Sequence, residues 1–293
     1  MRSRESFNYG KVLSMPRSLQ LEKQNMKGLP PQFSSFVTSL VKEVESIEGF
    51  LSPNEIRFLA LLAACPTTKG EILEIGSFKG KSTVVLAKAA ALTLNPKVVA
   101  VDPMTAPSIT DPDLKNAASS FADFQANLRQ HDVAEQVEFH CTFSHELAKT
   151  WARPLRLLWI DADHTYQGTK QDLDLFAPHL ADGAIVSFHD VLHEFEGAIR
   201  VFMEDILLHP HFGRVGMCGS LGWAQFHADA DFCRSYADQK LQLYKRLSRL
   251  IPYVVFKNEL NGWEKKKYKV LRARVPHGAV DPAKWLQSVT SVT

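Results

Sequence analysis

The chain has 293 residues, 45% hydrophobic and 23% charged, which is typical of a globular protein with one large domain and extensions. Its net charge of +2 gives no electrostatic reason to expect a nucleic acid or an anionic membrane as partner. No apolar run approaches the roughly 20 residues that cross a bilayer, and the basic start "MRSRESFNYGK" is not followed by an apolar signal core. We therefore expect a cytoplasmic protein.

The cysteines are far apart and show no C-x-x-C spacing, which argues against a structural zinc site and against a disulfide framework. They are predicted to be reduced and mostly buried. Their positions are Cys65, Cys141, Cys218 and Cys233.

The N-terminal part begins with a polar arm, residues 1–30, that is expected to be loosely held. Apolar residues three and four positions apart then predict an amphipathic helix over 32–47. A second helix follows, with Ser52 as N-cap, Pro53 at the first helical position and Glu55 completing a capping box.

Strand and helix patterns alternate in the middle of the chain. The predicted strands cover 71–76, 97–102, 137–141, 155–161 and 183–190, and the predicted helices cover 81–92, 112–130, 144–151, 167–178 and 194–207. Such alternation predicts a doubly wound α/β fold with a mostly parallel sheet. Two further strands, "RVGMCG" and "LGWAQF", joined by a Gly-Ser turn, predict an antiparallel edge hairpin and bring the sheet to seven strands.

The C-terminal part is expected to continue with a basic amphipathic helix over 231–250. The rest of the tail is not assigned. Its "EKKKYK" cluster either touches an anionic partner or forms a solvated face.

The first strand ends in a glycine turn, "EILEIGSFKGKST". Gly76 allows a sharp turn and Gly80 a close approach to a ligand, while Asp102, at the end of the next strand, suits a ribose diol. The G-x-x-x-G spacing is neither a dinucleotide fingerprint nor a P-loop, and Glu74 would repel a phosphate but suit a cationic group such as a sulfonium. A bound nucleoside is predicted, with a plain tight turn as the alternative.

Charged side chains end two later strands, "LLWIDADHTY" and "IVSFHD". Asp161 and Asp190 end neighbouring strands about 5 Å apart, and with an imidazole they could bind a divalent cation. Three alternatives stay open: Asp163 caps the helix that starts near Tyr166, His164 is structural, and His189 only packs beside the cluster.

These stretches together resemble the class I S-adenosylmethionine-dependent methyltransferases. The similarity covers about residues 49–205 and is greatest to the branch with catechol-type and macrolide-sugar O-methyltransferases. The resemblance implies a Rossmann-like methyltransferase fold that uses S-adenosyl-L-methionine and a divalent metal, Mg, Mn or similar. It also implies O-methylation of a small-molecule hydroxyl, on a sugar, a phenol or another secondary metabolite.

The resemblance also assigns residues. Cofactor binding would fall to Glu74, Gly76, Ser77, Gly80, Ser82, Asp102, Phe143, Ser144 and His145. The metal ligands would be Asp161, His189 and Asp190, and catalysis would fall to His164, as the base, and Asp161. Two departures are plain: Phe78 stands where the family often has another glycine, and His189 where it often has an acidic or amide residue.

The expected organisation has three parts: an arm and helix over 1–48, the methyltransferase domain over 49–228, and an extension over 229–293. The loop over 104–116 is expected to act as a lid or substrate wall. Two alternatives remain, a fold relative with a different reaction (for example a hydroxylase-associated protein) and a non-catalytic regulatory partner. A homo-oligomer also stays open.

Overall fold

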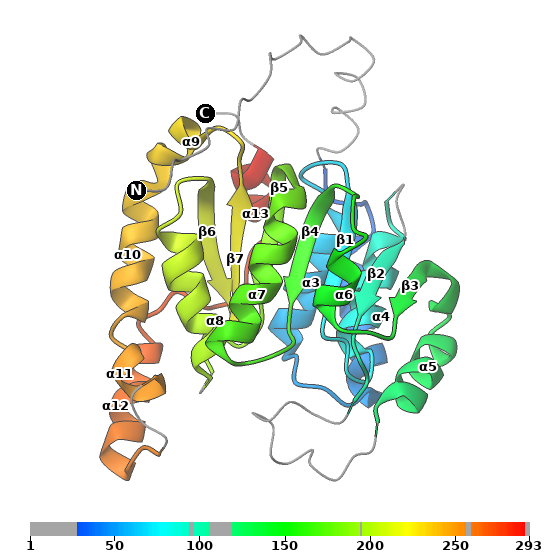
Figure 1. Ribbon diagram of the computed structural model, residues 1–293, viewed down its shortest axis with the longest axis horizontal. Coiled ribbons are helices and arrows are strands. Elements are labelled where there is room, and N and C mark those ends of the chain that lie inside the picture. Colours follow the sequence, from blue (N-terminus) through cyan, green and yellow to red (C-terminus); the bar gives the residue numbers. More distant parts are fainter. Residues whose placement is uncertain (1–27, 94–96, 106–118, 194, 256–258, 291–293) are drawn as a thin grey trace.

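A computed structural model describes residues 28–93, 97–105, 119–193, 195–255 and 259–290, and shows one central sheet with helices on both faces (Figure 1). The strands are β1 (Glu71–Ile75), β2 (Val98–Val101), β3 (Val137–His140), β4 (Leu155–Ile160), β5 (Leu180–Phe188), β6 (Phe212–Cys218) and β7 (Leu221–Phe226). Their order is β3-β2-β1-β4-β5-β7-β6, and β7 runs antiparallel to both of its neighbours. The predicted fold class is confirmed, including the edge hairpin and its turn at Gly219 and Ser220.

The α-helices are α2 (Phe33–Glu43), α3 (Pro53–Ala64), α4 (Lys81–Ala90), α5 (Phe121–Gln130), α6 (Ser144–Ala148), α7 (Tyr166–Phe176), α8 (Glu196–Val201), α9 (Ala230–Cys233), α10 (Ala237–Leu247), α11 (Ile251–Val254), α12 (Gly262–Arg272) and α13 (Pro282–Thr290). Short 3₁₀ segments are η1 (Val44–Ser46), η3 (Ala134–Gln136), η4 (Ala177–His179) and η6 (Arg234–Tyr236), and η5 (Phe202–Leu207) is a π-helical segment that continues α8. None of the described helices is long and apolar enough to cross a membrane.

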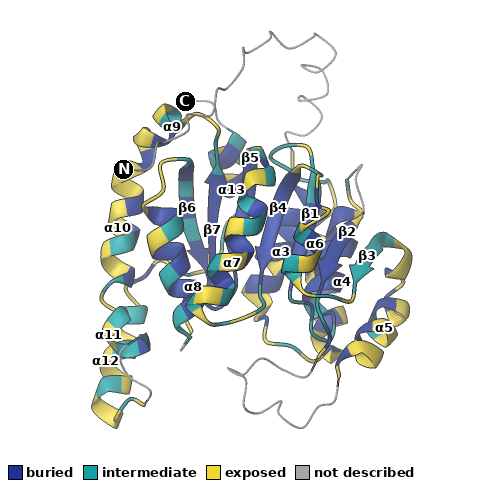
Figure 2. Ribbon diagram, in the orientation of Figure 1, coloured by how far each residue is buried: buried dark blue, intermediate teal, exposed yellow. Residues whose placement is uncertain are grey.

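The sheet divides the hydrophobic core into two clusters, because successive side chains of a strand point to opposite faces. Ile72 of β1 and Trp159 of β4 pack with α2–α5 and α13 on one face. Leu73 and Leu158 pack with α6–α8 and α10–α12 on the other. Figure 2 shows the resulting contrast between the buried strands and the largely exposed α12. The N-terminal helix α2 thus covers one face of the sheet, whereas the C-terminal extension covers both, with α13 on the face of α2 and α10–α12 on the other. The limits of these extensions as separate parts stay a prediction.

Several elements differ from those that the sequence patterns predict, or lie outside the described residues. The predicted helix over 231–250 is split into α9, η6 and α10, with Asp229 capping α9 and the buried Tyr236 at the break. Most of the predicted loop over 104–116, and the predicted arm up to residue 27, lie outside the described residues. Cys65, Cys218 and Cys233 are buried and Cys141 is exposed, all four being free thiols.

The predicted capping box of α3 is present, and its glutamate also reaches the edge hairpin. Glu55 accepts a hydrogen bond from the Ser52 N–H (2.7 Å), and its other oxygen accepts from the N–H (2.5 Å) and hydroxyl (2.8 Å) of Ser220. Burial would raise the pKa of Glu55, but these bonds outweigh it and leave that pKa below its usual value. One buried carboxylate therefore joins α3 to the turn between β6 and β7.

We expect Glu55→Gln to lower the free energy of unfolding by about 2 kcal/mol at pH 7, because an amide cannot replace a charged acceptor for these donors. Since the native pKa is depressed, the carboxylate stabilises the fold above its ordinary pKa near 4.5, and this contribution is lost as pH falls. Urea denaturation at several pH values measures both effects, with the exposed Glu135→Gln as control. A Glu55→Gln deficit that did not shrink in acid would contradict the assignment.

Candidate functional site

A cavity of about 1790 Å³ lies at the carboxyl ends of the strands, where ligands of doubly wound sheets bind. It is larger than the roughly 300–1,000 Å³ of a pocket for one small ligand, so it has room for a donor and an acceptor together. Its walls come from the glycine turn, the ends of β2, β4 and β5, the start of α6, and two segments distant in sequence, residues 48–51 and the α11–α12 region.

The glycine turn is packed directly against the end of β4. Gly76 has φ +87°, and a side chain there would collide with the backbone carbonyl of Asp161. The backbone closes this contact from both sides, since Gly76 N–H donates to Val101 O (3.0 Å) and Asp161 N–H donates to Ile75 O (2.9 Å). Only glycine fits here. The cavity also reaches Ser77 and Ser82, and Gly80, as N-cap of α4, has the same left-handed conformation.

Glu74 lies beneath this turn rather than on its ligand side. Its side chain is fully buried, and one carboxylate oxygen accepts hydrogen bonds from the hydroxyls of Ser77 (3.0 Å) and Thr83 (2.5 Å). Burial raises the pKa of Glu74 to about 7, although the hydroxyl hydrogen bonds oppose the shift. The structure thus corrects the expectation of a direct contact with the ligand: Glu74 holds the turn from behind.

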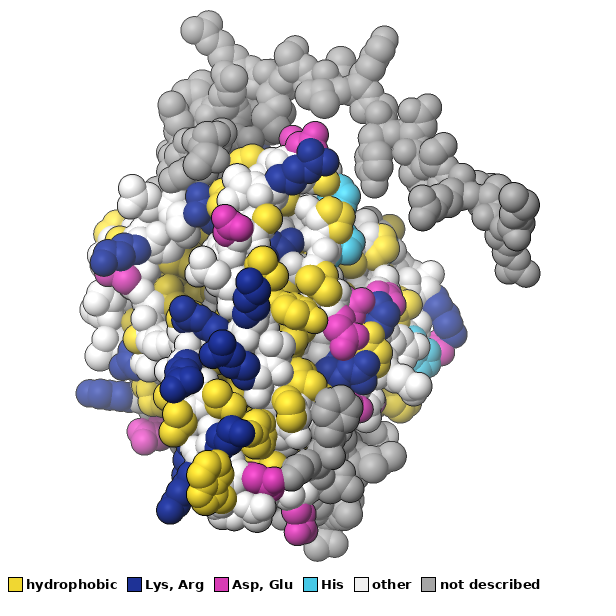
Figure 3. Space-filling model, turned by 90° about the vertical axis from the view of Figure 1, so that its left-hand side faces the viewer, with side chains coloured by type: hydrophobic (Ala, Val, Ile, Leu, Met, Phe, Trp, Pro, Cys, Tyr) yellow, Lys and Arg dark blue, Asp and Glu magenta, His cyan; other side chains and the backbone are white. Residues whose placement is uncertain are grey.

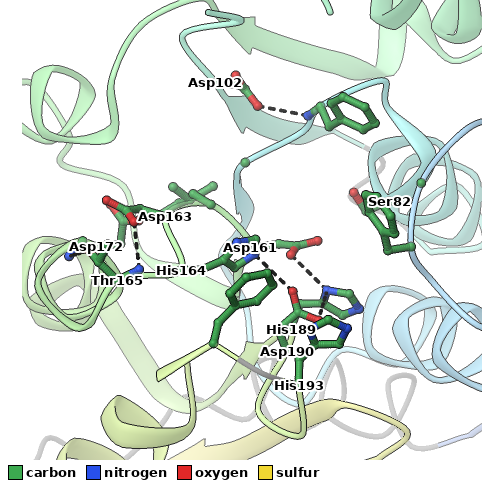
Figure 4. A pocket seen from close by; sticks show the side chains of 18 of the residues that line it. Ser82, Asp102, Asp161, Asp163, His164, Thr165, Asp172, His189, Asp190 and His193 are labelled. Carbon is green, nitrogen blue, oxygen red and sulfur yellow. Dashed lines mark hydrogen bonds and ion pairs between the residues drawn. The ribbon is translucent and has the colours of Figure 1, made fainter. Parts of the chain in front are cut away.

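Asp102 ties the end of β2 to the same turn (Figure 4). Its carboxylate accepts hydrogen bonds from the N–H groups of Ser77 (2.8 Å), Phe78 (3.0 Å) and Met104 (2.7 Å). Phe78 and Met104 have φ values of +45° and +53°, so these bonds hold two residues in a conformation that side chains rarely adopt. This explains how Phe78 is accommodated where a glycine was expected, and Asp102 still borders the cavity.

The start of α6 forms a further wall. Phe143 is 53% exposed, and its ring stacks on His145 with centroids 5.5 Å apart. Ser144 turns its hydroxyl onto α7 and donates to Asp172 (2.5 Å), whose pKa is raised by burial to about 6. All three predicted residues line the cavity, and Phe143 offers the apolar surface.

The charged ends of β4 and β5 converge as the sequence predicted (Figure 4). His189 Nδ1 lies 3.1 Å from a carboxylate oxygen of Asp161 and 3.1 Å from one of Asp190. His164 Nε2 lies 3.1 Å from the second oxygen of Asp190. Asp190 has φ +58°, a strained conformation of the kind that collects at functional sites.

The charges of this cluster depend on one another. Burial would lower the pKa of His189, but the two carboxylates outweigh it and hold that pKa well above 6.5. Burial raises the pKa of Asp161, whereas the hydrogen bonds from His164 and His189 outweigh burial at Asp190 and hold its pKa far below the usual value. The two carboxylates thus favour the charged form of His189, which would compensate part of their negative charge.

A divalent cation fits three of these side chains. Ligand atoms of Asp161, His164 and Asp190 lie within 4.8 Å of one another, and two carboxylates with an imidazole suit manganese, iron or magnesium. His189, predicted to be a ligand, is not in this group, and its Nδ1 contacts both carboxylates. The group holds His164 in its place, and the assignment of the ligands stays a prediction.

The segment after β4 fixes His164. Its ring stacks on Phe195 with centroids 4.3 Å apart and planes at 6°, and its carbonyl accepts from Gly197 N–H (2.9 Å). A side chain on Gly197 would collide with that carbonyl, so α8 approaches as closely as the backbone allows. The helix cap is Thr165, which accepts from Gly168 N–H, and not Asp163 as the sequence suggested; Asp163 accepts from Thr165 N–H.

Several residues of the site carried no sequence signal. Phe195 and Gly197 lie in a helical segment without a recognisable motif, and their contact with His164 depends on how α8 packs. Residues 48–51 and α12 reach the cavity only through the tertiary fold. For α12, the basic composition was visible but its location was not.

The chain is similar to methyltransferases in part of its sequence and in its fold. A family model described as a methyltransferase domain matches residues 73–191. The structure of the O-methyltransferase NovP is similar in fold, with a TM-score of 0.54 and 13% identity over 67% of this chain and 98% of that one. An O-methyltransferase from Bacillus cereus in complex with SAH gives 19% identity over 70% and 97% of the two chains, with a TM-score of 0.46. A methyltransferase from Geobacter sulfurreducens gives 15% identity over 75% of this chain and 100% of that one, with a TM-score of 0.47.

The buried position of Glu74 predicts a pH-dependent stability. Its native pKa of about 7, above the ordinary 4.5, means that folding retains a proton in this interval, so the wild-type stability falls as pH rises from 4.5 to 7. Glu74→Gln removes this titration. We therefore expect the free energy of unfolding of Glu74→Gln, relative to that of the wild type, to rise by about 3 kcal/mol from pH 4.5 to pH 8. Urea denaturation measures it, with Glu45→Gln as exposed control; a pH-independent difference would contradict the burial argument.

Proposed function

We propose that residues 73–191, which match a family model described as a methyltransferase domain, form a class I S-adenosylmethionine-dependent methyltransferase domain, and that the protein transfers a methyl group to a hydroxyl oxygen of a small molecule. The observation that carries the proposal is the contact of the glycine turn with the Asp161 carbonyl, which puts the donor's binding turn beside the Asp161, His164 and Asp190 cluster. NovP, the similar fold described as an O-methyltransferase, supports the choice of oxygen as acceptor.

The cavity walls fit the proposed donor. The backbone at Gly76 borders the cavity, Asp102 presents carboxylate oxygens, and Phe143 gives an apolar surface for a base. S-adenosylmethionine supplies the methyl group on a positively charged sulfur. The carboxylates of Asp161 and Asp190 near the turn favour such a cation electrostatically.

His164 is proposed as the base that removes the acceptor's hydroxyl proton. The hydroxyl oxygen then forms the bond to the methyl carbon while the carbon–sulfur bond breaks. Asp190, 3.1 Å from His164 Nε2, stabilises the imidazolium that results, and Phe195 keeps the ring in one orientation. Asp161 and Asp190 would hold a divalent metal, which lowers the pKa of a bound hydroxyl. The same nitrogen of His164 cannot serve as a metal ligand and as the base, so these two roles are separable by experiment.

Calorimetry with S-adenosylmethionine tests the donor site. We expect Asp102→Ala to raise the dissociation constant about 10- to 100-fold, because the turn loses its charged acceptor and the ligand a carboxylate partner. Asp238→Ala, an exposed change on α10, is the matched control and should bind as the wild type does. Equal affinity of all three proteins would contradict a donor site at this end of the sheet.

Manganese titration separates the roles of His164. If His164 is the base, His164→Ala should leave the affinity for manganese within about twofold while lowering turnover about 10²- to 10⁴-fold. Asp161→Asn should weaken manganese binding at least about tenfold. Turnover is followed by S-adenosylhomocysteine release with a panel of phenols and sugars.

Treatment with EDTA followed by metal add-back completes this test. A metal-assisted reaction should stop after chelation and return with the added ion. Full activity of the metal-free enzyme would show that Asp161 and Asp190 do not act by holding a metal. A large loss of manganese affinity in His164→Ala would show that His164 is a metal ligand rather than the base.

A further inference from the structure

Helix α12 turns one basic side toward the cavity. Its sequence, "GWEKKKYKVLR", starts at an Asn261 capping box, and Lys265, Lys269 and Arg272 recur four and three positions apart, which puts them on one face. All three line the cavity, together with Tyr268 between them. Figure 3 shows how Lys and Arg side chains gather on the side of the molecule that α10–α12 form.

These cations differ from the others around the cavity. Lys79 is paired with Glu48 (2.6 Å) and Asp123 (3.0 Å), and Lys81 donates to the Gly49 carbonyl (3.2 Å). In contrast, within the described ranges no ion pair or side-chain hydrogen bond satisfies Lys265, Lys269 or Arg272. The Arg272 Nε is even buried without a partner there. A buried donor of this kind is costly unless a ligand accepts from it.

The basic face adjoins the reacting groups. The Tyr268 hydroxyl donates to the backbone carbonyls of Leu192 (3.3 Å) and His193 (3.4 Å), in the loop that directly follows Asp190. The cavity is therefore bipolar, with carboxylates at the strand ends and cations along α12. An acceptor placed at His164 and extending toward α12 meets positive charge at its far end.

We propose that the methyl acceptor carries a phosphate group that α12 binds through Lys265, Lys269 and Arg272; this rests on the function proposed above. The three side chains span about 10 Å along the helix axis. Phosphate oxygens outnumber those of a carboxylate, and an arginine binds two of them at once while lysines act as point charges. A neutral acceptor would leave the buried Arg272 Nε without an acceptor.

An anionic membrane is the rival partner for a basic helix with exposed apolar residues. On α12 those residues, Trp263 (74% exposed) and Val270 (55% exposed), are seven positions apart and lie about half a helical turn away from the cavity cations. A membrane would therefore meet the face of α12 that carries Trp263 and Val270, whereas Lys265, Lys269 and Arg272 line the cavity. The small phosphate-bearing ligand explains the inner face better.

Calorimetry with inorganic pyrophosphate tests the proposal on protein saturated with S-adenosylhomocysteine, which keeps the probe away from the glycine turn. The variant Lys265→Gln/Lys269→Gln/Arg272→Gln should bind pyrophosphate about tenfold or more weakly than the wild type. The matched control, Lys245→Gln/Arg249→Gln/Lys266→Gln, removes the same charge outside the cavity and should stay within about twofold. The double variant Lys265→Gln/Lys269→Gln keeps Arg272 and covers the case in which the triple variant does not fold.

The outcomes are distinct. Absence of pyrophosphate binding, or an equal loss in the control, overturns the inference and leaves the methyltransferase proposal intact as long as S-adenosylhomocysteine binds. If S-adenosylhomocysteine does not bind, the proposed function fails instead, and the pyrophosphate titration on the ligand-free protein still reports on α12. Vesicles of phosphatidylglycerol form a third arm: binding that the triple variant alone loses, without any binding of pyrophosphate, would assign α12 to a membrane.

Discussion

The contact between the glycine turn and the end of β4 is the constraint on which the site depends. Strand order reverses between β1 and β4, so two loops leave the sheet there in opposite directions and open a crevice. Without a side chain on Gly76, the turn can rest on the Asp161 carbonyl. A backbone contact thereby brings the residues that would bind the donor next to those that would act on the acceptor.

Charge is arranged around this contact in layers. Next to the turn lie carboxylates, and His189, whose pKa they raise, sits between two of them. Further out, at α12, the cavity becomes basic. The position of His189 matters because two carboxylates without a partner between them would repel each other in a medium of low dielectric. A metal bound at Asp161 and Asp190 would share these carboxylates with His189.

Much of this architecture follows from local sequence. Alternating apolar patterns were enough to predict the mostly parallel sheet with its antiparallel hairpin. The cavity also brings together Gly76, Asp102 and Asp161, because the carboxyl ends of parallel strands meet at one edge of a sheet. Side-chain partners were harder. Glu74 looked like a ligand contact yet lies behind the turn, since its direction depends on strand pleat and on the hydroxyls of α4. The position of α12 depends on packing over a distant part of the chain, which no local pattern encodes.

The shared carboxylate of Glu55 has a consequence for how the protein is made. Its partner Ser220 is 165 positions further along the chain. Helix α3 can therefore form before the hydrogen bonds between Glu55 and the hairpin turn do. The strand order adds to this, because β4 pairs with the edge of β1 that β2 leaves open, and β2 and β3 precede β4 in the chain. Contacts between such remote segments form slowly. During synthesis on the ribosome, Glu55 therefore lacks its Ser220 donors until the hairpin turn has emerged.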